Sequence, residues 1–372
     1  MGLLHDSGSS ANTTCPMPAH LVEDSTETVV GDYTFYHFNM ILSGSCAALT
    51  CLMMFILMTM HATRFSNPNE QLKIMRICTL LPLYSIFSFL SICFPDADVY
   101  LEGWIEVFQG IALYWFLMLL CDFLAPNDRH RVHFFQSLQI PSRNGQTTDG
   151  LTWLQRTWFC VLQYPVVNFI VAIAQCITQA AGIYCLESQN RHFAHLWLNI
   201  IQIISTGVAV MAILGFYKNL KSYMTEYKPL MKLLAFKLIV GLVFLEKIIF
   251  TILQSAGALK TSSTLNYADV NIGLPNMVIC IQLVPFAFLF HFAYNTRMYR
   301  LSAVPLRSTS SQQYLSVESA EDGRLEKKRY QGGPLGVMAW LALVNPLDLF
   351  RDIKSTFYML RAARAGAMDY QM

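Results

Sequence analysis

The sequence predicts an all-α integral membrane bundle of seven transmembrane helices, with a lumenal or extracellular N-terminus and a cytoplasmic C-terminus. Three observations predict this fold class. First, 54% of the 372 residues are apolar and only 13% are charged, about half the charged share of a soluble globular protein. Second, seven windows reach roughly 20 apolar residues, the length that crosses a hydrocarbon core of about 30 Å. Third, Lys and Arg concentrate in alternate loops.

The seven predicted spans are Phe38–Met60, Ile74–Phe94, Ile105–Leu124, Trp158–Tyr184, Leu196–Phe216, Pro229–Leu253 and Leu274–Tyr294. Each is expected to be helical, because lipid offers no hydrogen-bond partner to a free backbone amide.

The basic residues set the expected orientation. Residues 1–34 contain no Lys or Arg, whereas the tail is rich in them from Arg297 onward. Asn12 opens an Asn-Thr-Thr glycosylation sequon, which is used only on the lumenal side. Residues 1–34 also lack a basic start followed by an apolar run, so no cleavable signal peptide is expected. The formal net charge of +2 gives no indication of nucleic-acid binding.

The expected organisation has five parts. They are a lumenal or extracellular segment (1–34), a seven-helix domain (35–297), a largely disordered cytoplasmic linker (298–344), an amphipathic cytoplasmic helix (345–364) and a short tail (365–372). The amphipathic helix is predicted from Asn345 as N-cap, Pro346 at the first helical position and apolar residues at spacings of three and four. It suits an anionic membrane surface, a partner's groove or packing on the protein's own loops.

Two further features concern the loops and the cysteines. In the third loop, His130 to Ile140 is expected to be helical, and Pro141 to Gly150 is expected to be a flexible link. A disulfide is possible among Cys15, Cys93 and Cys185, and the sequence cannot pair them. Cys121 lies near the predicted cytoplasmic face, where it could be acylated.

No catalytic motif is visible, so the chain is not expected to be an enzyme, and neither a cofactor nor a metal is expected. Polar residues inside the spans are more informative, because each is costly in lipid and usually faces the bundle. Lys237 and Glu246 are nine residues apart, so they lie on opposite helix faces, about 13 Å apart along the axis. They cannot neutralise each other. Glu246 and Lys247 diverge by about 100° around the helix and cannot both reach one interface easily, so at least one must meet another helix or a wet cavity. This favours a polar path or pocket over simple anchoring. The candidate path residues are Lys237, Glu246, Lys247, Tyr84, Glu106, Gln163, Tyr164, Gln202 and Gln282. The alternative for any single amide is a hydrogen bond that joins two helices.

Several stretches together resemble the organic solute transporter alpha / transmembrane protein 184 family. They are LLPLYSIFSFLS, EVFQGIALYWFLMLLCDFL, LQYPVVNF, YKPLMKLLAFKLIVGLVFLE, NMVICIQL and NPLDLFRDI. Lys237, Tyr84, Glu106, Gln163 and Tyr164 fit the family pattern. The chain departs from it at Leu245-Glu246, where the family often has Trp-Gln, near Asn168, where it often has Arg, and at Gln282, where it often has Glu.

The resemblance implies a seven-span transporter-like protein that moves amphipathic, steroid-like organic solutes or lipids across a membrane. It also implies a vacuolar, lysosomal or plasma membrane location, contact with membrane lipids, and either a single-span partner subunit or a homo-oligomer. Lys237 and Lys247 would attract an anionic head group, and Glu246 would balance their charge or meet a cation.

The alternative is an organiser or adaptor of a vacuolar or lysosomal membrane that acts through its tail. Tyr314 and Val317 fit a tyrosine sorting signal. They also fit the pattern that adds a strand to a ubiquitin-like autophagy modifier. Phe350 and Ile353 fit the second pattern on the amphipathic helix.

Overall fold

The computed structural model describes residues 15, 27–29, 31–125, 128–141, 147–186, 191–224, 231–232, 241–242, 245–246, 249–250, 252–253, 259, 261–262, 264–299, 330–345 and 347–364. Its longer helices are α1 (Phe35–Ala62), α2 (Pro68–Cys78), α3 (Leu80–Cys93), α4 (Asp98–Leu124), α5 (Asp128–Gln136), α6 (Gly150–Ala180), α7 (Ala194–Leu220), α9 (Leu274–Ala293), α11 (Val337–Val344) and α12 (Leu347–Arg364). Short helical turns cover Pro95–Ala97, Lys221–Tyr223, Asp269–Gly273, Thr296–Tyr299 and Pro334–Gly336. The strands are β1 (Gln139–Pro141) and β2 (Thr147–Asp149).

Six helical segments in the described part of the chain are long and apolar enough to cross a membrane: α1, α2 with α3, α4, α6, α7 and α9. They confirm six of the predicted spans and the all-α membrane class. The remaining predicted span, Pro229–Leu253, lies largely outside the described residues.

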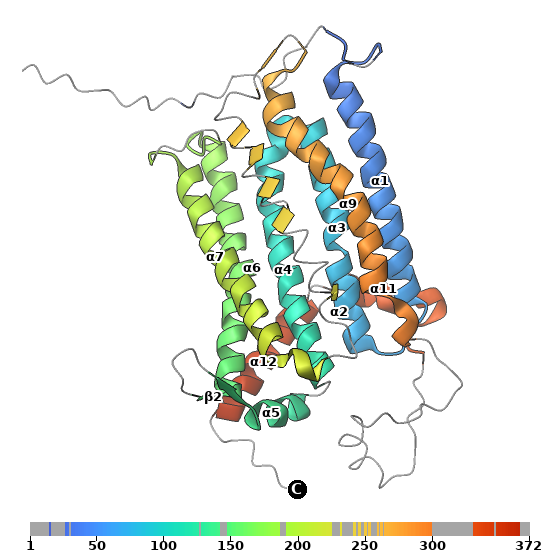
Figure 1. Ribbon diagram of the computed structural model, residues 1–372, viewed down its shortest axis with the longest axis vertical. Helices are drawn as coiled ribbons and strands as arrows, with labels where there is room; N and C mark the ends of the chain where they lie inside the picture. The colour runs from blue at the N-terminus through green and yellow to red at the C-terminus, as the bar shows by residue number, and fades with distance from the viewer. Residues whose placement is uncertain are drawn as a thin grey trace, which may run out of the picture.

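The spans form two groups of three, seen side by side in Figure 1. In one group α6 packs against both α4 and α7, and in the other α1, α3 and α9 pack on one another. The contacts of α4 with α2 and α3 join the groups. Helix α4 is therefore central, and 83% of its most apolar window is buried. We call the end of the bundle that holds α5 and α12 the tail end (Figure 1).

The outward faces of the spans are apolar, as helices in contact with lipid require. Large exposed side chains include Phe55 on α1, Ile170 on α6, Met211 on α7 and Phe292 on α9. The interior of the bundle is packed around aromatic and aliphatic side chains, such as Tyr114 and Phe116 of α4.

Three predicted elements differ in the structure. The second span is two helices, α2 and α3, that meet at Thr79. Pro82 causes the break, because it has no N–H to donate to the carbonyl of Cys78 four residues earlier. The third loop is helical only to Gln136, and its supposed flexible link contributes β2, which pairs antiparallel with β1. Asp149 at the end of β2 then caps α6 by accepting from the Thr152 N–H at 3.1 Å.

The predicted boundary of the disordered linker at residue 344 is also wrong. Helix α11, with the sequence VMAWLALV, forms inside it and packs on α1 and α2. An almost wholly apolar segment gains from burial, so it does not behave as a polar linker.

The cysteines give one confirmed prediction and one correction. Cys15 and Cys185 form a disulfide, while Cys93 is free. Cys15 is thereby tied to the loop between α6 and α7. Cys121 is only 2% exposed, so its thiol is not accessible to an acylating enzyme in this packing.

Candidate functional site

A chain of hydrogen bonds, which we call the polar seam, links α3, α4 and α6 inside the bundle. Tyr84 Oη donates to Gln109 Oε1 at 2.7 Å, and Gln109 Nε2 donates to Tyr164 Oη at 2.6 Å. Tyr164 Oη in turn donates to Glu106 Oε2 at 3.2 Å. Gln109 is eleven residues into α4, about 17 Å along its axis, so the seam lies deep in the membrane. The structure thus brings together three predicted path residues, Tyr84, Glu106 and Tyr164.

Two glycines let α4 approach α6 closely beside the seam. A Cβ on Gly110 would lie 2.8 Å from Cα of Pro165, and a Cβ on Gly103 would lie 3.0 Å from the Gln175 side chain. Small residues commonly permit such close packing between membrane helices. The amide groups of Asn168 and Gln175 on α6 also donate to carbonyls of α4, at 3.1 and 2.8 Å. The polar seam therefore belongs to a tightly packed and hydrogen-bonded interface between helices.

Glu246 and Gln282 form a second polar contact within the membrane. Gln282 Nε2, on α9, donates to Glu246 Oε2 at 2.8 Å, and both side chains are half-buried. The resemblance places an amide at position 246 and a carboxylate at position 282. In this chain the carboxylate is at position 246 and the amide at position 282. The contact therefore still pairs one amide with one carboxylate.

We expect the two groups to be exchangeable as a pair. Gln282→Glu places two carboxylates against each other, and it should lower the free energy of unfolding by about 1.5 kcal/mol, the low end for a hydrogen bond to a charged group. Combining it with Glu246→Gln should restore wild-type stability in a thermal unfolding assay of the purified protein in lipid. A double variant as unstable as the sum of the single variants would contradict the contact.

Gln163 and Gln202 lie at the interface of α6 and α7. Gln163 exchanges two hydrogen bonds with Ser205 of α7, donating to its carbonyl at 2.9 Å and accepting from its hydroxyl at 2.8 Å. Gln202 is half-buried one turn away, and its carbonyl accepts from Thr206. These two predicted path residues are separate from the polar seam.

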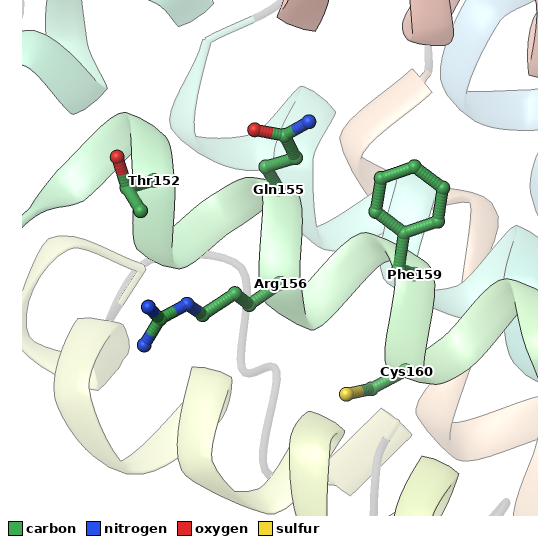
Figure 2. Close-up of a pocket in the computed structure, with 5 residues that line it drawn as sticks. All are labelled: Thr152, Gln155, Arg156, Phe159 and Cys160. Carbon is green, nitrogen blue, oxygen red and sulfur yellow. The ribbon is translucent and has the colours of Figure 1, made fainter.

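A groove of about 370 Å³ lies along α6 near the tail end. It is lined by Thr152, Gln155, Arg156, Phe159 and Cys160. Figure 2 shows the five side chains along two turns of the helix, with Arg156 and Cys160 on the same side of its axis. We call it the α6 groove. Its polar residues stand nearest the start of the helix, and Phe159, which contacts Phe357 of α12 edge to face, lies further into the membrane.

The α6 groove continues into the lipid-facing surface. The residue spacings of three and four that place Arg156 and Phe159 on one helical face also include Val166 and Ile170. Their side chains are 51% and 61% exposed, and Phe159 is 44% exposed. From Arg156 to Ile170 the helix rises about 21 Å. The cationic side chain of Arg156 thus lies at the membrane boundary, next to an apolar stripe formed by Phe159, Val166 and Ile170.

A network of charges at the tail end was not predicted from the sequence. Asp122 of α4 bonds to both Lys73 of α2 and Arg131 of α5, the latter at 2.8 Å, and its side chain is 2% exposed. Arg76 of α2 lies over the Trp115 ring and pairs with Asp348 of α12 at 2.9 Å. Asp122 itself could have indicated this network, because an acidic residue at the end of an apolar span usually has a charged partner.

Some predicted site residues cannot be placed. Lys237, Lys247, Asn12, Tyr314 and Val317 lie outside the described residues. Phe350 and Ile353 are placed, on helix α12, where Phe350 is 68% exposed and Ile353 packs against the core. They are not an extended segment that could add a strand to a partner in this conformation.

Comparisons with known proteins identify the family. Residues 39–299 match the family described as organic solute transporter Ostalpha. The chain is 24% identical over 273 residues to a transmembrane protein 184 homolog of Dictyostelium discoideum, an alignment that covers 69% of this chain and 52% of the relative. It is 23% identical over 265 residues to Protein LAZ1 of Arabidopsis thaliana, covering 65% of this chain and 54% of the relative. The chain therefore matches about half the length of these relatives, and no solved structure matches it. Because the family model covers well over half of the sequence, the chain is a multi-pass integral membrane protein that belongs to the organic solute transporter Ostalpha family.

Proposed function

We propose that this protein facilitates the movement of amphipathic organic solutes with an anionic head, steroid-like or lipid-like, between the two leaflets of its membrane. The observation that carries the proposal is the α6 groove, in which Arg156 stands at one end of an exposed apolar stripe. A guanidinium binds sulfate, carboxylate or phosphate through charge-assisted hydrogen bonds. The apolar part of the solute would lie along Phe159, Val166 and Ile170, in contact with α6 on one side and lipid on the other.

The groove suits a solute that enters sideways from the bilayer. Its exposed stripe removes the need to transfer the apolar part of the solute through water, which costs about 25 cal/mol for each Å² of apolar surface. The polar seam has a different role in this proposal. Its side chains bond to one another, so they hold α3, α4 and α6 together, and the solute moves along the exposed side chains of Phe159, Val166 and Ile170 on α6.

The disulfide supports the proposed orientation. Disulfides persist in oxidising compartments, so the Cys15–Cys185 bond favours a lumenal or extracellular position for that end of the bundle. The α6 groove, near the opposite end, would then take solute from the cytoplasmic leaflet.

The adaptor alternative depends on Tyr314 and Val317, which lie outside the described residues, and on Phe350 and Ile353, which are helical. We favour transport because of the α6 groove and its apolar stripe. Lys237, Lys247 and Glu246 remain proposed contributors to binding of the anionic head group and to charge balance.

Proteoliposome flux tests the proposal. The purified protein should accelerate movement of a sulfated sterol across the bilayer, and it should leave a small hydrophilic anion such as sulfate unaffected. The reason is that the groove offers both a cation and an apolar stripe. Equal rates for the sulfated sterol in protein-containing and protein-free liposomes would contradict the proposal.

A further inference from the structure

Helix α11 presents large apolar side chains away from the bundle. The helix packs against α1 and α2, and Ala339 is its only fully buried residue. Val337, Met338, Leu341 and Val344 are 49%, 59%, 64% and 77% exposed. The apolar surface continues onto the first turn of α12, where Leu347 and Phe350 are 63% and 68% exposed. Such a continuous apolar face in contact with water would be unfavourable. We call these six side chains the α11 face.

The depth of α11 follows from its contact with α1. The Trp340 ring stacks on the Phe55 ring, with centroids 5.4 Å apart and planes inclined by 26°. Phe55 is itself 58% exposed, on the lipid-facing side of α1. Helix α1 has 28 residues, which gives a length of about 42 Å and leaves about 6 Å beyond a 30 Å hydrocarbon core at each end. Phe55 precedes the last residue of α1 by seven positions, about 10 Å, so it lies about 4 Å inside the hydrocarbon.

Trp340 therefore lies at the edge of the hydrocarbon layer, the position that tryptophan favours in membrane proteins. The α11 face is continuous with the lipid-facing surface of α1 through this stacked pair. Helix α11 also lies at the same depth as the tail ends of the spans. Figure 1 shows it beside the ends of α1 and α2.

The backbone around α11 is fastened to the bundle. The Gln331 N–H donates to the Phe65 carbonyl at 2.8 Å, and Tyr330 Oη donates to the Ala62 carbonyl at 3.3 Å. A Cβ on Gly336 would lie 2.7 Å from the Ala62 side chain, so only glycine permits this approach. At the other end of α11, Arg76 donates to the Ala342 carbonyl at 3.1 Å. This donor satisfies a carbonyl in the last turn of the helix, as a position near lipid requires.

Helix α12 adds cations next to the α11 face. The Arg351 side chain is 76% exposed, and Lys354 and Arg361 are also exposed. On the side toward the bundle, Tyr114 donates to Asp352 at 2.8 Å, and Met359 and Leu360 are buried. A helix that combines exposed apolar and basic side chains suits the boundary between acyl chains and anionic head groups.

We propose that α11 and the first turn of α12 form an in-plane membrane element, inserted into the leaflet at the tail end and held there by Arg76 and the glycine contact with Ala62. The partner of the α11 face is the lipid of the bilayer that contains the bundle: acyl chains against Leu341 and Val344, and anionic head groups against Arg351 and Lys354. The proposal does not depend on transport.

Photo-crosslinking to lipid tests this inference on the wild-type protein. The full chain is reconstituted in nanodiscs of phosphatidylcholine and phosphatidylserine that contain a phosphatidylcholine with a diazirine near the end of one acyl chain. Adduct sites are then mapped by peptide mass spectrometry. We expect adducts on residues 337–350 at a yield comparable to that on the exposed face of α1 around Phe55. We also expect about tenfold more adduct there than on strands β1 and β2, which serve as a polar control at the same end.

Adducts on α1 without adducts on residues 337–350 would overturn the proposal. Cross-links between residues 337–350 of two copies of the chain, in place of lipid adducts, would also overturn it, because the face would then be a contact between copies. A second measurement uses Leu341→Glu, with Gln139→Glu on the exposed side of β1 as the control for an added carboxylate. Leu341→Glu should lower the adduct yield on residues 337–350 about tenfold and leave the yield on α1 unchanged.

Discussion

Asp122→Ala is expected to lower the free energy of unfolding by about 3–5 kcal/mol, the cost of removing one partner from a buried ion pair. The carboxylate has two cationic partners, Lys73 and Arg131, whose side chains are 12% and 5% exposed. Its removal leaves both cations near the hydrocarbon boundary without their counter-charge. Because the three residues come from α2, α4 and α5, their loss should loosen the tail end of the bundle. Thermal unfolding of the purified protein in lipid measures the effect.

Arg351→Ala is the matched control for this prediction. Arg351 pairs with Asp348 at 3.4 Å, but its side chain is 76% exposed, so the pair should contribute no more than about 1 kcal/mol. Asp122→Asn retains a hydrogen-bond acceptor, so its loss in free energy of unfolding should lie between those of Asp122→Ala and Arg351→Ala. An Asp122→Ala variant as stable as wild type would show that the buried network is not what holds α2, α4 and α5 together.

Gly110→Val is expected to separate α4 from α6. The new Cβ would lie 2.8 Å from Cα and 2.9 Å from N of Pro165, which are backbone atoms that cannot move aside independently. Overpacking of this kind typically costs about 1–3 kcal/mol, and a backbone clash should reach the upper end of that range. Gln109 is the neighbouring residue, so displacement of α4 should also break its hydrogen bonds to Tyr84 and Tyr164.

Gly215→Val in α7 provides the control, since nothing lies within 4 Å of a Cβ at that position. It should be neutral or slightly stabilising, because valine is a better helix former than glycine. Thermal unfolding in lipid should therefore separate the two glycine variants. Equal stabilities would contradict the close approach of α4 and α6.

The apolar windows predicted the spans well because length and polarity are properties of a single segment. The break at Thr79 was not predicted, because a proline such as Pro82 kinks some membrane helices and breaks others according to what packs around it. Helix α11 was missed because its eight residues are too short for a spanning window and follow a polar stretch. Strands β1 and β2 were not predicted, because they are short and flank a run of turn-forming residues.

The candidate site was less predictable. A sequence shows which side chains share one face of a helix, but it does not show which other helix that face packs against. Tyr84, Glu106 and Tyr164 were predicted to line a path, and their side chains meet inside the bundle. That Gln109 bonds to both Tyr84 and Tyr164 follows only from how α3, α4 and α6 are rotated against one another. Arg156 precedes the predicted span that begins at Trp158, and its place in a groove depends on the neighbours of α6. Gln163 joins α6 to α7, which is the structural alternative that the sequence left open.

The central claim is that Arg156 holds the anionic head of an amphipathic solute as it enters the α6 groove. Flux of a sulfated sterol into proteoliposomes should be compared for wild type, Arg156→Ala and Arg191→Ala. Arg191 is an exposed arginine on the loop between α6 and α7, at the opposite end of the bundle. We predict that Arg156→Ala lowers the flux at subsaturating solute about tenfold, which corresponds to about 1.4 kcal/mol of lost interaction. Arg191→Ala should transport at the wild-type rate. Wild-type flux in a folded Arg156→Ala variant would contradict the account.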